Sequence, residues 1–182
     1  MTPFYLDQAA LTPQDCADLM ALCAVAPMRD AGLVGGTTAH QIRRADLIWL
    51  DDLPQAAWVM DRMVNIVAAA NRDFGFDLDD FAESPQVARY GAERAGHFDW
   101  HSDIGAGPLA ARRKLTVVVQ LSDPASYDGG VLELWPDSQQ RSIPRGQGVA
   151  AVFPSFVLHR VTPVTVGERW SLTLWSHGPA FR

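Results

Sequence analysis

From Pro85 to the C-terminus, the sequence consists of short stretches in which hydrophobic residues recur with a period close to two. That period is typical of β-strands with one buried face, and turn-forming pairs such as Asp128-Gly129 and Pro154-Ser155 separate the stretches. A series of short strands at such spacing predicts a barrel or a sandwich, in which each strand buries one face. The predicted strands are Gln86–Tyr90, Leu115–Leu121, Val131–Trp135, Gln140–Ile143, Val149–Phe153, Val157–Val161 and Arg169–Ser176.

The half of the chain before Pro85 has a helical pattern instead. Thr12 and Pro13, followed by Asp15, form a typical helix start, with a hydroxyl cap, a proline at the first helical position and an acidic residue in the first turn. Apolar residues spaced three and four positions apart predict a second helix from Pro54 to about Asn71. We therefore predict a single domain over residues 1–182, in which mostly helical support (1–84) covers a β core (85–182).

The composition restricts the classes of partner. With 182 residues, of which 48% are hydrophobic and 20% charged, the chain has the profile of an ordinary globular domain. Its net charge of -6 argues against a nucleic-acid backbone as the main partner, because such partners select basic surfaces. No apolar run approaches the roughly 18 residues that would predict a membrane span. The N-terminus also lacks the pattern of a signal peptide.

Two cysteines bear on the cellular compartment. Cys16 and Cys23 lie seven positions apart on the first predicted helix. Their Cα atoms would be about 10 Å apart, which is too far for a disulfide bond. Two reduced thiols on one helix face fit a reducing compartment, so we predict a cytoplasmic location.

The strongest local signal of chemistry is the motif His101-Ser102-Asp103. In an extended strand, residues i and i+2 point the same way, so this motif presents an imidazole and a carboxylate on one face. The stretch His97-Phe98-Asp99 repeats the pattern four residues earlier. The pattern alone therefore does not select between the two pairs.

Two later residues complete a recognisable set of groups. His159 lies in an otherwise apolar predicted strand, and Arg169 begins the next strand, with Pro163 and Gly167 predicting a turn that makes the two strands neighbours. Two imidazoles and one carboxylate are the ligands of non-haem Fe(II) oxygenases, which leave other positions open for a 2-oxo acid and dioxygen. An arginine matches the far carboxylate of such an acid, and Ser171 on the same face can donate a further hydrogen bond.

These residues stand within a longer series of motifs. The series comprises Tyr90-Gly91, Phe98 to Asp103, Leu115 to Ser122, Gly129 to Leu134, Phe153 to Ser155, His159 to Val164, Gly167 to Ser171 and Trp175 to Pro179. In order and spacing it resembles the 2-oxoglutarate/Fe(II)-dependent oxygenase superfamily, specifically its small prolyl 4-hydroxylase-like branch. The resemblance covers roughly the C-terminal half of the chain. It implies a mainly β (α+β) fold, a double-stranded β-helix of the jelly-roll or cupin type with buttressing N-terminal helices.

The resemblance also implies a role for each matching residue. His101, Asp103 and His159 become the ligands of Fe(II), and Arg169 becomes the clamp for the co-substrate 2-oxoglutarate, with O2 as the second co-substrate. The pair at positions 97 and 99 is less favoured, because the family does not place a ligand pair so early relative to the loop that follows.

Five further residues are candidates for binding. Tyr90 matches a strand tyrosine that often hydrogen-bonds the co-substrate in the branch. Thr116 points into the barrel if its neighbours on the strand point out, and it is a second candidate for contact with the co-substrate. Trp100, Trp135 and His97 are candidates for contact with substrate near the mouth of the barrel.

The resemblance implies hydroxylation of a peptidyl or protein side chain, with proline as the first candidate and with release of succinate and CO2. The same chemistry on a free amino acid or small metabolite is one alternative, and a non-catalytic β-barrel binding module is another. The carboxylate of Asp103 favours hydroxylation, because halogenating relatives carry Gly or Ala at this position. Segments 36–45 and 104–113 are candidate lids over the site. The substrate and the oligomeric state stay open at this stage.

Overall fold

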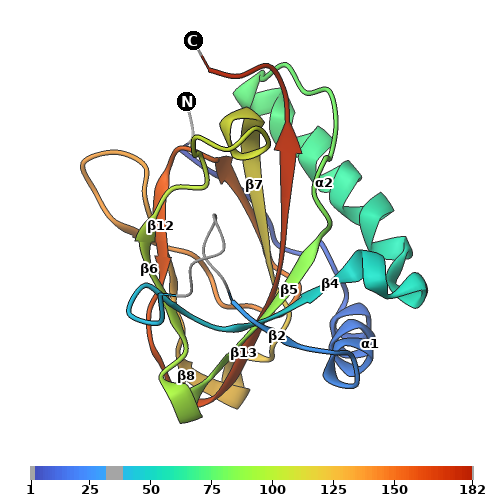
Figure 1. The fold of residues 1–182 in the computed structure, drawn as a ribbon, viewed down its shortest axis with the longest axis vertical. Coiled ribbons are helices and arrows are strands. Elements are labelled where there is room, and N and C mark those ends of the chain that lie inside the picture. Colours follow the sequence, from blue (N-terminus) through green and yellow to red (C-terminus); the bar gives the residue numbers. More distant parts are fainter. Residues whose placement is uncertain (1–2, 32–38, 182) are drawn as a thin grey trace.

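The computed structural model describes residues 3–31 and 39–181, and its strands form two antiparallel sheets that face each other (Figure 1). The larger sheet contains, in order, β1 (Tyr5–Asp7), β11 (Ala150–Pro154), β7 (Arg113–Gln120), β13 (Val164–His177), β5 (Gln86–Gly91), β4 (Asp46–Trp49) and β2 (Arg29–Asp30), and β8 (Tyr127–Gly129) pairs with β13. The smaller sheet contains β10 (Arg141–Ser142), β9 (Leu132–Trp135), β12 (Leu158–Val161), β6 (His97–His101) and β3 (Arg43–Arg44).

Two α-helices, α1 (Pro13–Ala24) and α2 (Trp58–Phe74), cover one face of the larger sheet. Figure 1 shows both helices on the side of that sheet away from β6 and β12. Their buried residues, such as Leu19 and Met63, share one hydrophobic cluster with Val117 and Leu172 of the sheet. Short 3-10 helices occur at Leu50–Asp52, Pro54–Ala56, Ala92–Arg94, Ala110–Arg112 and Pro124–Ser126.

The predicted start of the first helix is confirmed. The hydroxyl of Thr12 accepts a hydrogen bond from the backbone N–H of Asp15 at 3.1 Å, and the Asp15 carboxylate accepts from the N–H of Thr12 at 3.0 Å. Pro13 occupies the first helical position, where its missing N–H removes no helical hydrogen bond. The reciprocal cap fixes the direction in which α1 leaves the sheet.

The second helix differs from its prediction at both ends. Pro54 belongs to a separate 3-10 turn, and α2 begins at Trp58. The helix continues to Phe74 because the left-handed residue that ends it is Gly75, with φ 66°. Among the described residues, no helix is long and apolar enough to span a membrane.

The alternation of side chains along β7 divides the buried residues into two clusters. Val117 and Val119 face the helices, whereas Val118 belongs to a second cluster that lies between the two sheets. That inner cluster contains residues of both sheets, among them Tyr90 and Leu132. The site described below is formed by the polar residues at the edge of this inner cluster.

Several strands were not predicted from the sequence. β1, β2, β3 and β4 lie in the half that was predicted to be mostly helical, and each has only two to four residues. Such short strands have no measurable period, and pairing with distant strands defines them. β6 and β8 were also absent from the predicted set.

The predicted pairing of the strands that carry His159 and Arg169 is wrong. β12 pairs with β6 and β9 in the smaller sheet, whereas β13 pairs with β5, β7 and β8 in the larger one. The link at Thr162-Pro163 crosses between the sheets, and Gly167 lies inside β13. His159 and Arg169 therefore reach the space between the sheets from opposite sheets.

Candidate active site

A cavity of about 450 Å³ lies between the two sheets. Its lining includes His101, Asp103, His159, Arg169 and Ser171, which were predicted as site residues. Apolar residues of both sheets form much of the rest of the wall: Ala88, Phe98, Val118, Leu132 and Val161. A mainly apolar pocket with a few convergent polar groups has the general character of a small-molecule or active site.

The structure brings His101, Asp103 and His159 together. One ligand atom from each residue lies within 4.8 Å of the others. His101 ends β6 and is the register partner of His159 on β12. Asp103 follows the end of β6, and its backbone N–H donates to the carbonyl of Ser155 at 2.9 Å. Strand pairing thus positions both imidazoles, and a loop contact positions the carboxylate.

Backbone carbonyls fix the proton on each imidazole. The Nδ1 atom of His101 lies 2.7 Å from the carbonyl oxygen of Asp99, and that of His159 lies 2.9 Å from the carbonyl oxygen of Val157. A carbonyl oxygen only accepts hydrogen bonds, so Nδ1 carries a proton in both rings, and in the neutral form of each ring Nε2 keeps a free lone pair. The two Nε2 atoms lie 3.6 Å and 3.4 Å from the carboxylate oxygens of Asp103. Three donor atoms therefore converge in the form in which they bind a metal.

The protonation states of the cluster agree with this geometry. Burial, together with the neighbouring imidazole of His159, lowers the pKa of His101 to about 3. Burial would raise the pKa of Asp103, but the two histidines and hydrogen bonds from Trp175 and Thr116 hold it below its usual value. Oδ2 of Asp103 accepts from the Trp175 indole at 2.9 Å and from the Thr116 hydroxyl at 2.8 Å. At neutral pH, His101 is therefore a neutral imidazole and Asp103 a carboxylate.

A β-bulge in β6 decides which His-x-Asp pair faces the cavity. His159 and Val161 are two residues apart on β12, but their partners His101 and Phe98 are three apart on β6. The extra residue shifts the alternation, so that Phe98 and His101 both line the cavity and their rings stack at 3.5 Å. His97 is on the other side of this shift, and its ring nitrogens contact the backbone carbonyls of Ala95 and Gln41.

Arg169 is fully buried in the wall formed by the larger sheet. Its guanidinium donates to the Ser171 hydroxyl at 3.2 Å and to the side-chain oxygen of Gln120 at 3.0 Å, and it lies 5.3 Å from the ring centre of Tyr90. Burial lowers the pKa of Arg169, and no carboxylate of the described residues pairs with it. A buried cation with only neutral partners is costly, so this arrangement calls for an anionic ligand. Sequence reasoning missed Gln120, although its parity with Thr116 on β7 could have indicated it.

The other predicted site residues lie in different places. Tyr90 lines the cavity beside Arg169. Thr116 is absent from the lining, and its hydroxyl instead donates a hydrogen bond to the carboxylate of Asp103. Trp100 and Trp135 are absent from the lining, and their rings meet edge to face at 5.7 Å. Like His97, these two tryptophans could contact a substrate only outside the cavity.

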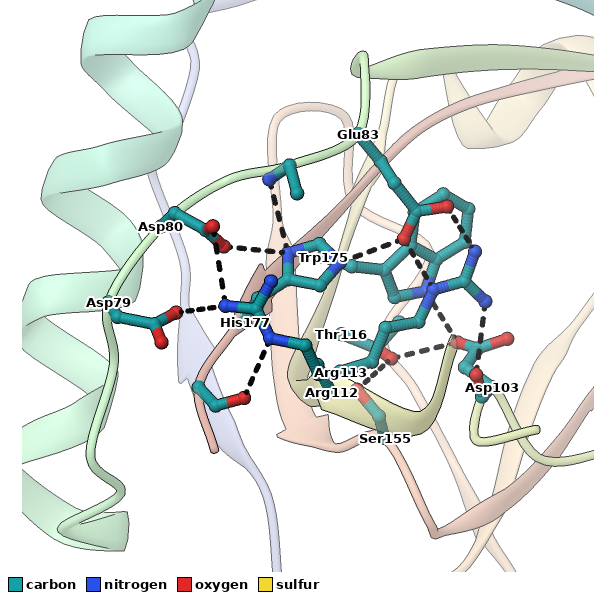
Figure 2. A network of polar contacts seen from close by, with 12 residues as sticks. Asp79, Asp80, Glu83, Asp103, Arg112, Arg113, Thr116, Ser155, Trp175 and His177 are labelled. Carbon is teal, nitrogen blue, oxygen red and sulfur yellow. Dashed lines mark hydrogen bonds and ion pairs between the residues drawn. The ribbon is translucent and has the colours of Figure 1, made fainter. Parts of the chain in front are cut away.

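A network of charged residues behind Asp103 was not predicted (Figure 2). Arg113 donates to the Asp103 carbonyl at 3.0 Å and to Glu83 at 2.6 Å, and its guanidinium lies 3.9 Å from the ring centre of Trp175. His177 contacts Glu83 at 2.9 Å through Nε2. Its Nδ1 accepts from the N–H of Ala82 at 3.2 Å, so Nε2 donates to the carboxylate. The residues of this network are isolated charged residues that lie far apart in the sequence at no regular spacing, so the sequence did not indicate that they meet.

Both candidate lid segments contribute to the cavity. Residues 36–38 of the first lie outside the described residues, but Ile42 and Arg43 line the cavity. From the second segment, Ile104, Gly105 and Arg113 line it. Whether either segment moves stays a prediction.

The residues present fit the cofactors that the resemblance implies. Two imidazoles and one carboxylate, with ligand atoms within 4.8 Å of one another, are a suitable donor set for Fe(II). The buried guanidinium of Arg169, with Ser171 beside it, suits the distal carboxylate of a 2-oxo acid. The proposed sites for Fe(II) and for 2-oxoglutarate are therefore both formed by residues of this chain.

Comparison with known proteins gives a family match. Residues 85–177 match the family model of the 2OG-Fe(II) oxygenase superfamily. A PKHD-type hydroxylase of Thioalkalivibrio sulfidiphilus is 30% identical over 172 residues, which cover 92% of this chain and 72% of that protein. A PKHD-type hydroxylase of Hyphomonas neptunium is 42% identical over 72 residues, which cover 40% of this chain and 32% of that protein. The chain thus spans about a third of one relative's length and about seven tenths of the other's.

Solved structures share the fold. A Pseudomonas putida prolyl-4-hydroxylase has a TM-score of 0.77 and 24% identity, with 97% of this chain and 93% of that chain covered. A Trichoplax adhaerens prolyl hydroxylase, in complex with a hypoxia inducible factor oxygen degradation domain peptide fragment, has a TM-score of 0.79 and 17% identity, with 97% and 84% covered. These likenesses confirm the predicted double-stranded β-helix with N-terminal helices.

Proposed function

We propose that this chain, which belongs to the 2OG-Fe(II) oxygenase superfamily, hydroxylates a peptidyl or protein side chain and releases succinate and CO2. It is a 2-oxoglutarate-dependent Fe(II) hydroxylase, and its cofactor and co-substrates are those of the family: Fe(II), 2-oxoglutarate and O2. The observation that carries the proposal is the convergence of His101, Asp103 and His159 in a cavity that Arg169 also lines, a cation that pairs with no carboxylate among the described residues.

Each site residue has a proposed role. His101, Asp103 and His159 would hold the iron, and the chemistry that the iron would supply is the activation of dioxygen coupled to decarboxylation of 2-oxoglutarate. Arg169 binds the distal carboxylate of 2-oxoglutarate, and Ser171 assists it. Burial of the guanidinium strengthens this ion pair, because little solvent screens it.

The surrounding residues orient these groups and exclude water. Thr116 and Trp175 hold one oxygen of Asp103, which fixes the direction of the other. Val118, Leu132 and Val161 form an apolar wall that keeps bulk water away from the reacting centre. The ring of Tyr90, with its centre 5.3 Å from the guanidinium of Arg169, helps to hold that guanidinium in position.

A peptidyl substrate is supported by the neighbours. Both compared structures are prolyl hydroxylases, and the Trichoplax adhaerens protein is in complex with a peptide fragment. The cavity volume of about 450 Å³ also suits a free amino acid, which remains the second candidate class. A non-catalytic binding module is disfavoured, because a module without turnover has no need of three converging metal donors.

A cytoplasmic location is also part of the proposal. Cys16 and Cys23 are both free and buried in the cluster between α1 and the larger sheet. Burial raises the pKa of each thiol to about 11, which keeps both in the unreactive neutral form. Two inert reduced thiols are compatible with a reducing compartment.

Anaerobic titration of Fe(II) and 2-oxoglutarate tests the site assignment, through the metal-to-ligand charge-transfer band of the complex. Wild type and H97A should both give the band, whereas H101A should lose it and R169A should require much more 2-oxoglutarate. H97A is the matched control, since it removes a histidine of the same strand that lies outside the cavity. Absence of the band in wild type would sink the proposal.

Mass spectrometry of proline-containing peptides and of free amino acids tests the substrate class. The expected product is a peptide that has gained one oxygen atom, with a matching amount of succinate. Turnover of free amino acids alone would replace the peptidyl substrate by the second class.

A further inference from the structure

Arg43 is a cation in the lining of the cavity, on the smaller sheet. Its strand pairs with β6, and Arg43 is the register partner of Phe98. The guanidinium lies 4.5 Å from the ring centre of Phe98, and that ring stacks at 3.5 Å on the imidazole of His101. One aromatic ring therefore separates the charge of Arg43 from a proposed iron ligand.

The backbone around Arg43 is held in place. The N–H of Arg43 donates to the carbonyl of Ala39 at 3.0 Å, and the N–H of Asp99 donates to the carbonyl of Ile42 at 2.8 Å. These contacts tie the short strand to β6, which carries His101. The backbone from which the Arg43 side chain extends is therefore fixed relative to the proposed iron site.

The side chain of Arg43 has no partner for its charge within residues 3–31 and 39–181. Its Nε atom is buried without a hydrogen-bond partner, and none of the ion pairs in this part of the chain includes it. The neighbouring Arg44 differs, because it donates to the carbonyls of His40 at 3.1 Å and Arg94 at 3.2 Å. A half-buried guanidinium whose Nε has no partner among the described residues suits an anion that enters the cavity.

The other two arginines of the cavity lining are already accounted for. Arg113 pairs with Glu83 and supports the backbone of Asp103. Arg169 lies in the larger sheet and is proposed to bind the co-substrate. Arg43 lies in the smaller sheet, so it is available for a different anion.

We infer that Arg43 binds a carboxylate of the substrate, next to the carbon that is hydroxylated, and so selects substrates that carry a carboxylate at that position. The inference rests on the proposed function and specifies the substrate of the same site. The carboxylate is either the α-carboxylate of a C-terminal or free amino acid, or the side chain of an Asp or Glu flanking the target residue. The planar fork of an arginine suits both, because it binds either carboxylate through two parallel hydrogen bonds.

A set of matched probes tests this inference. The probes are a capped uncharged peptide with a central proline, the same peptide with Asp on either side of the proline, a peptide that ends in proline with a free carboxylate, and free L-proline. Wild type should turn over at least one carboxylate probe with a kcat/KM roughly ten- to a hundred-fold above the capped peptide, the range for a hydrogen bond to a charged group. The probe that gains most identifies the source of the carboxylate.

Variants of the two adjacent arginines separate recognition from folding. R43Q should abolish the preference, mainly through KM, while R43K retains part of it and R44Q retains it in full. R43E should prefer a peptide with Lys in place of Asp. Equal rates of wild type on charged and uncharged probes, or a preference that survives in R43Q, would overturn the inference.

Two further measurements keep the inference distinct from the proposed function. The affinity for 2-oxoglutarate, read from the anaerobic charge-transfer band, should be unchanged in R43Q and reduced in R169Q. A loss of affinity in R43Q as large as in R169Q would assign Arg43 to the co-substrate and overturn the inference. A wild type without the band would refute the proposed function itself. If the band forms but no probe is turned over or shifts it, the inferred peptide or amino-acid substrate with a carboxylate is refuted.

Discussion

At the scale of single residues, Asp103 is fixed through both its backbone and its side chain. The backbone N–H donates to Ser155 and the carbonyl accepts from Arg113, while Oδ2 accepts from Thr116 and Trp175. A carboxylate held in this way needs little reorganisation to bind a metal through its other oxygen. Residues that never touch the metal should therefore influence its affinity.

Trp175→Phe tests this idea, because it removes the N–H that donates to Asp103 and keeps an aromatic ring under Arg113. We expect the affinity for Fe(II) to fall by roughly ten-fold, the range for loss of a group that orients a ligand. Anaerobic calorimetry of Fe(II) binding measures this change. Trp135→Phe is the control, since that ring is outside the cavity lining and should leave the affinity unchanged. Equal affinities in all three proteins would show that the indole does not orient the carboxylate.

Sequence spacing predicted the residues whose side chains converge in the cavity, but it did not predict the residues that hold them in place. His101 and Asp103 are two residues apart in a recognisable series of motifs, and His159 stands alone in an apolar strand. Glu83 and Arg113 are instead brought together from positions that are 30 residues apart, and neither has a distinctive neighbourhood. Such long-range polar pairs depend on the tertiary fold, which local patterns do not encode.

At the scale of elements, seven of the nine strands described between Gln86 and His177 were predictable, and strand pairing was not. Hydrophobic alternation marks those seven strands, but alternation says nothing about the partner of a strand. β12 and β13 are consecutive, yet they belong to different sheets. The bulge in β6 was equally hidden, because no glycine or proline marks it, and it alone separates the face of His97 from that of His101.

Gly130, in the turn between β8 and β9, packs closely against Arg169 of the proposed co-substrate site. Its φ of 58° lies in the left-handed region, and an added Cβ would lie 2.9 Å from Cδ of Arg169. Because the guanidinium of Arg169 is held by Ser171 and Gln120, the side chain cannot move aside without losing these contacts. Gly130→Ala should therefore displace the proposed clamp.

We expect Gly130→Ala to weaken 2-oxoglutarate binding by roughly ten-fold, in line with the cost of a small misplacement of a binding group. Gly75→Ala is the matched control, because Gly75 has a similar φ of 66° and open space at the position of Cβ. Both variants should lose about 1 kcal/mol of folding stability from backbone strain. Titration of the anaerobic charge-transfer band compares the affinities, and equal weakening in both variants would refute the specific link to Arg169.

At the scale of the whole molecule, Glu83 joins the helical layer to the barrel. It lies in the segment between α2 and β5, and its carboxylate accepts hydrogen bonds from Arg113 on β7 and His177 at the end of β13. Figure 2 shows these groups packed around Trp175, directly behind Asp103. The side chains of Arg113 and Glu83 are only 8% and 16% exposed, so solvent screens this ion pair weakly.

Glu83→Gln leaves Arg113 without its countercharge, and we expect the free energy of unfolding at neutral pH to fall by about 3 kcal/mol. Burial would raise the pKa of Glu83, but Arg113 and His177 hold it below its usual 4.5. The native state therefore keeps the carboxylate charged at a pH at which the unfolded chain binds a proton. This stabilisation is present above about pH 4.5 and is lost as the pH falls through the lower pKa of the native state.

The unfolding free energies of wild type and E83Q should consequently converge on acidification, which urea denaturation at a series of pH values measures. Asp79→Asn is the control, because Asp79 pairs with Arg112 at the exposed surface and such pairs contribute little. A difference between wild type and E83Q that stays constant from neutral pH to below about pH 4 would show that the ion pair does not stabilise the fold. In that case the charge network behind Asp103 would act on the site alone, and the link between helices and barrel would depend on apolar packing.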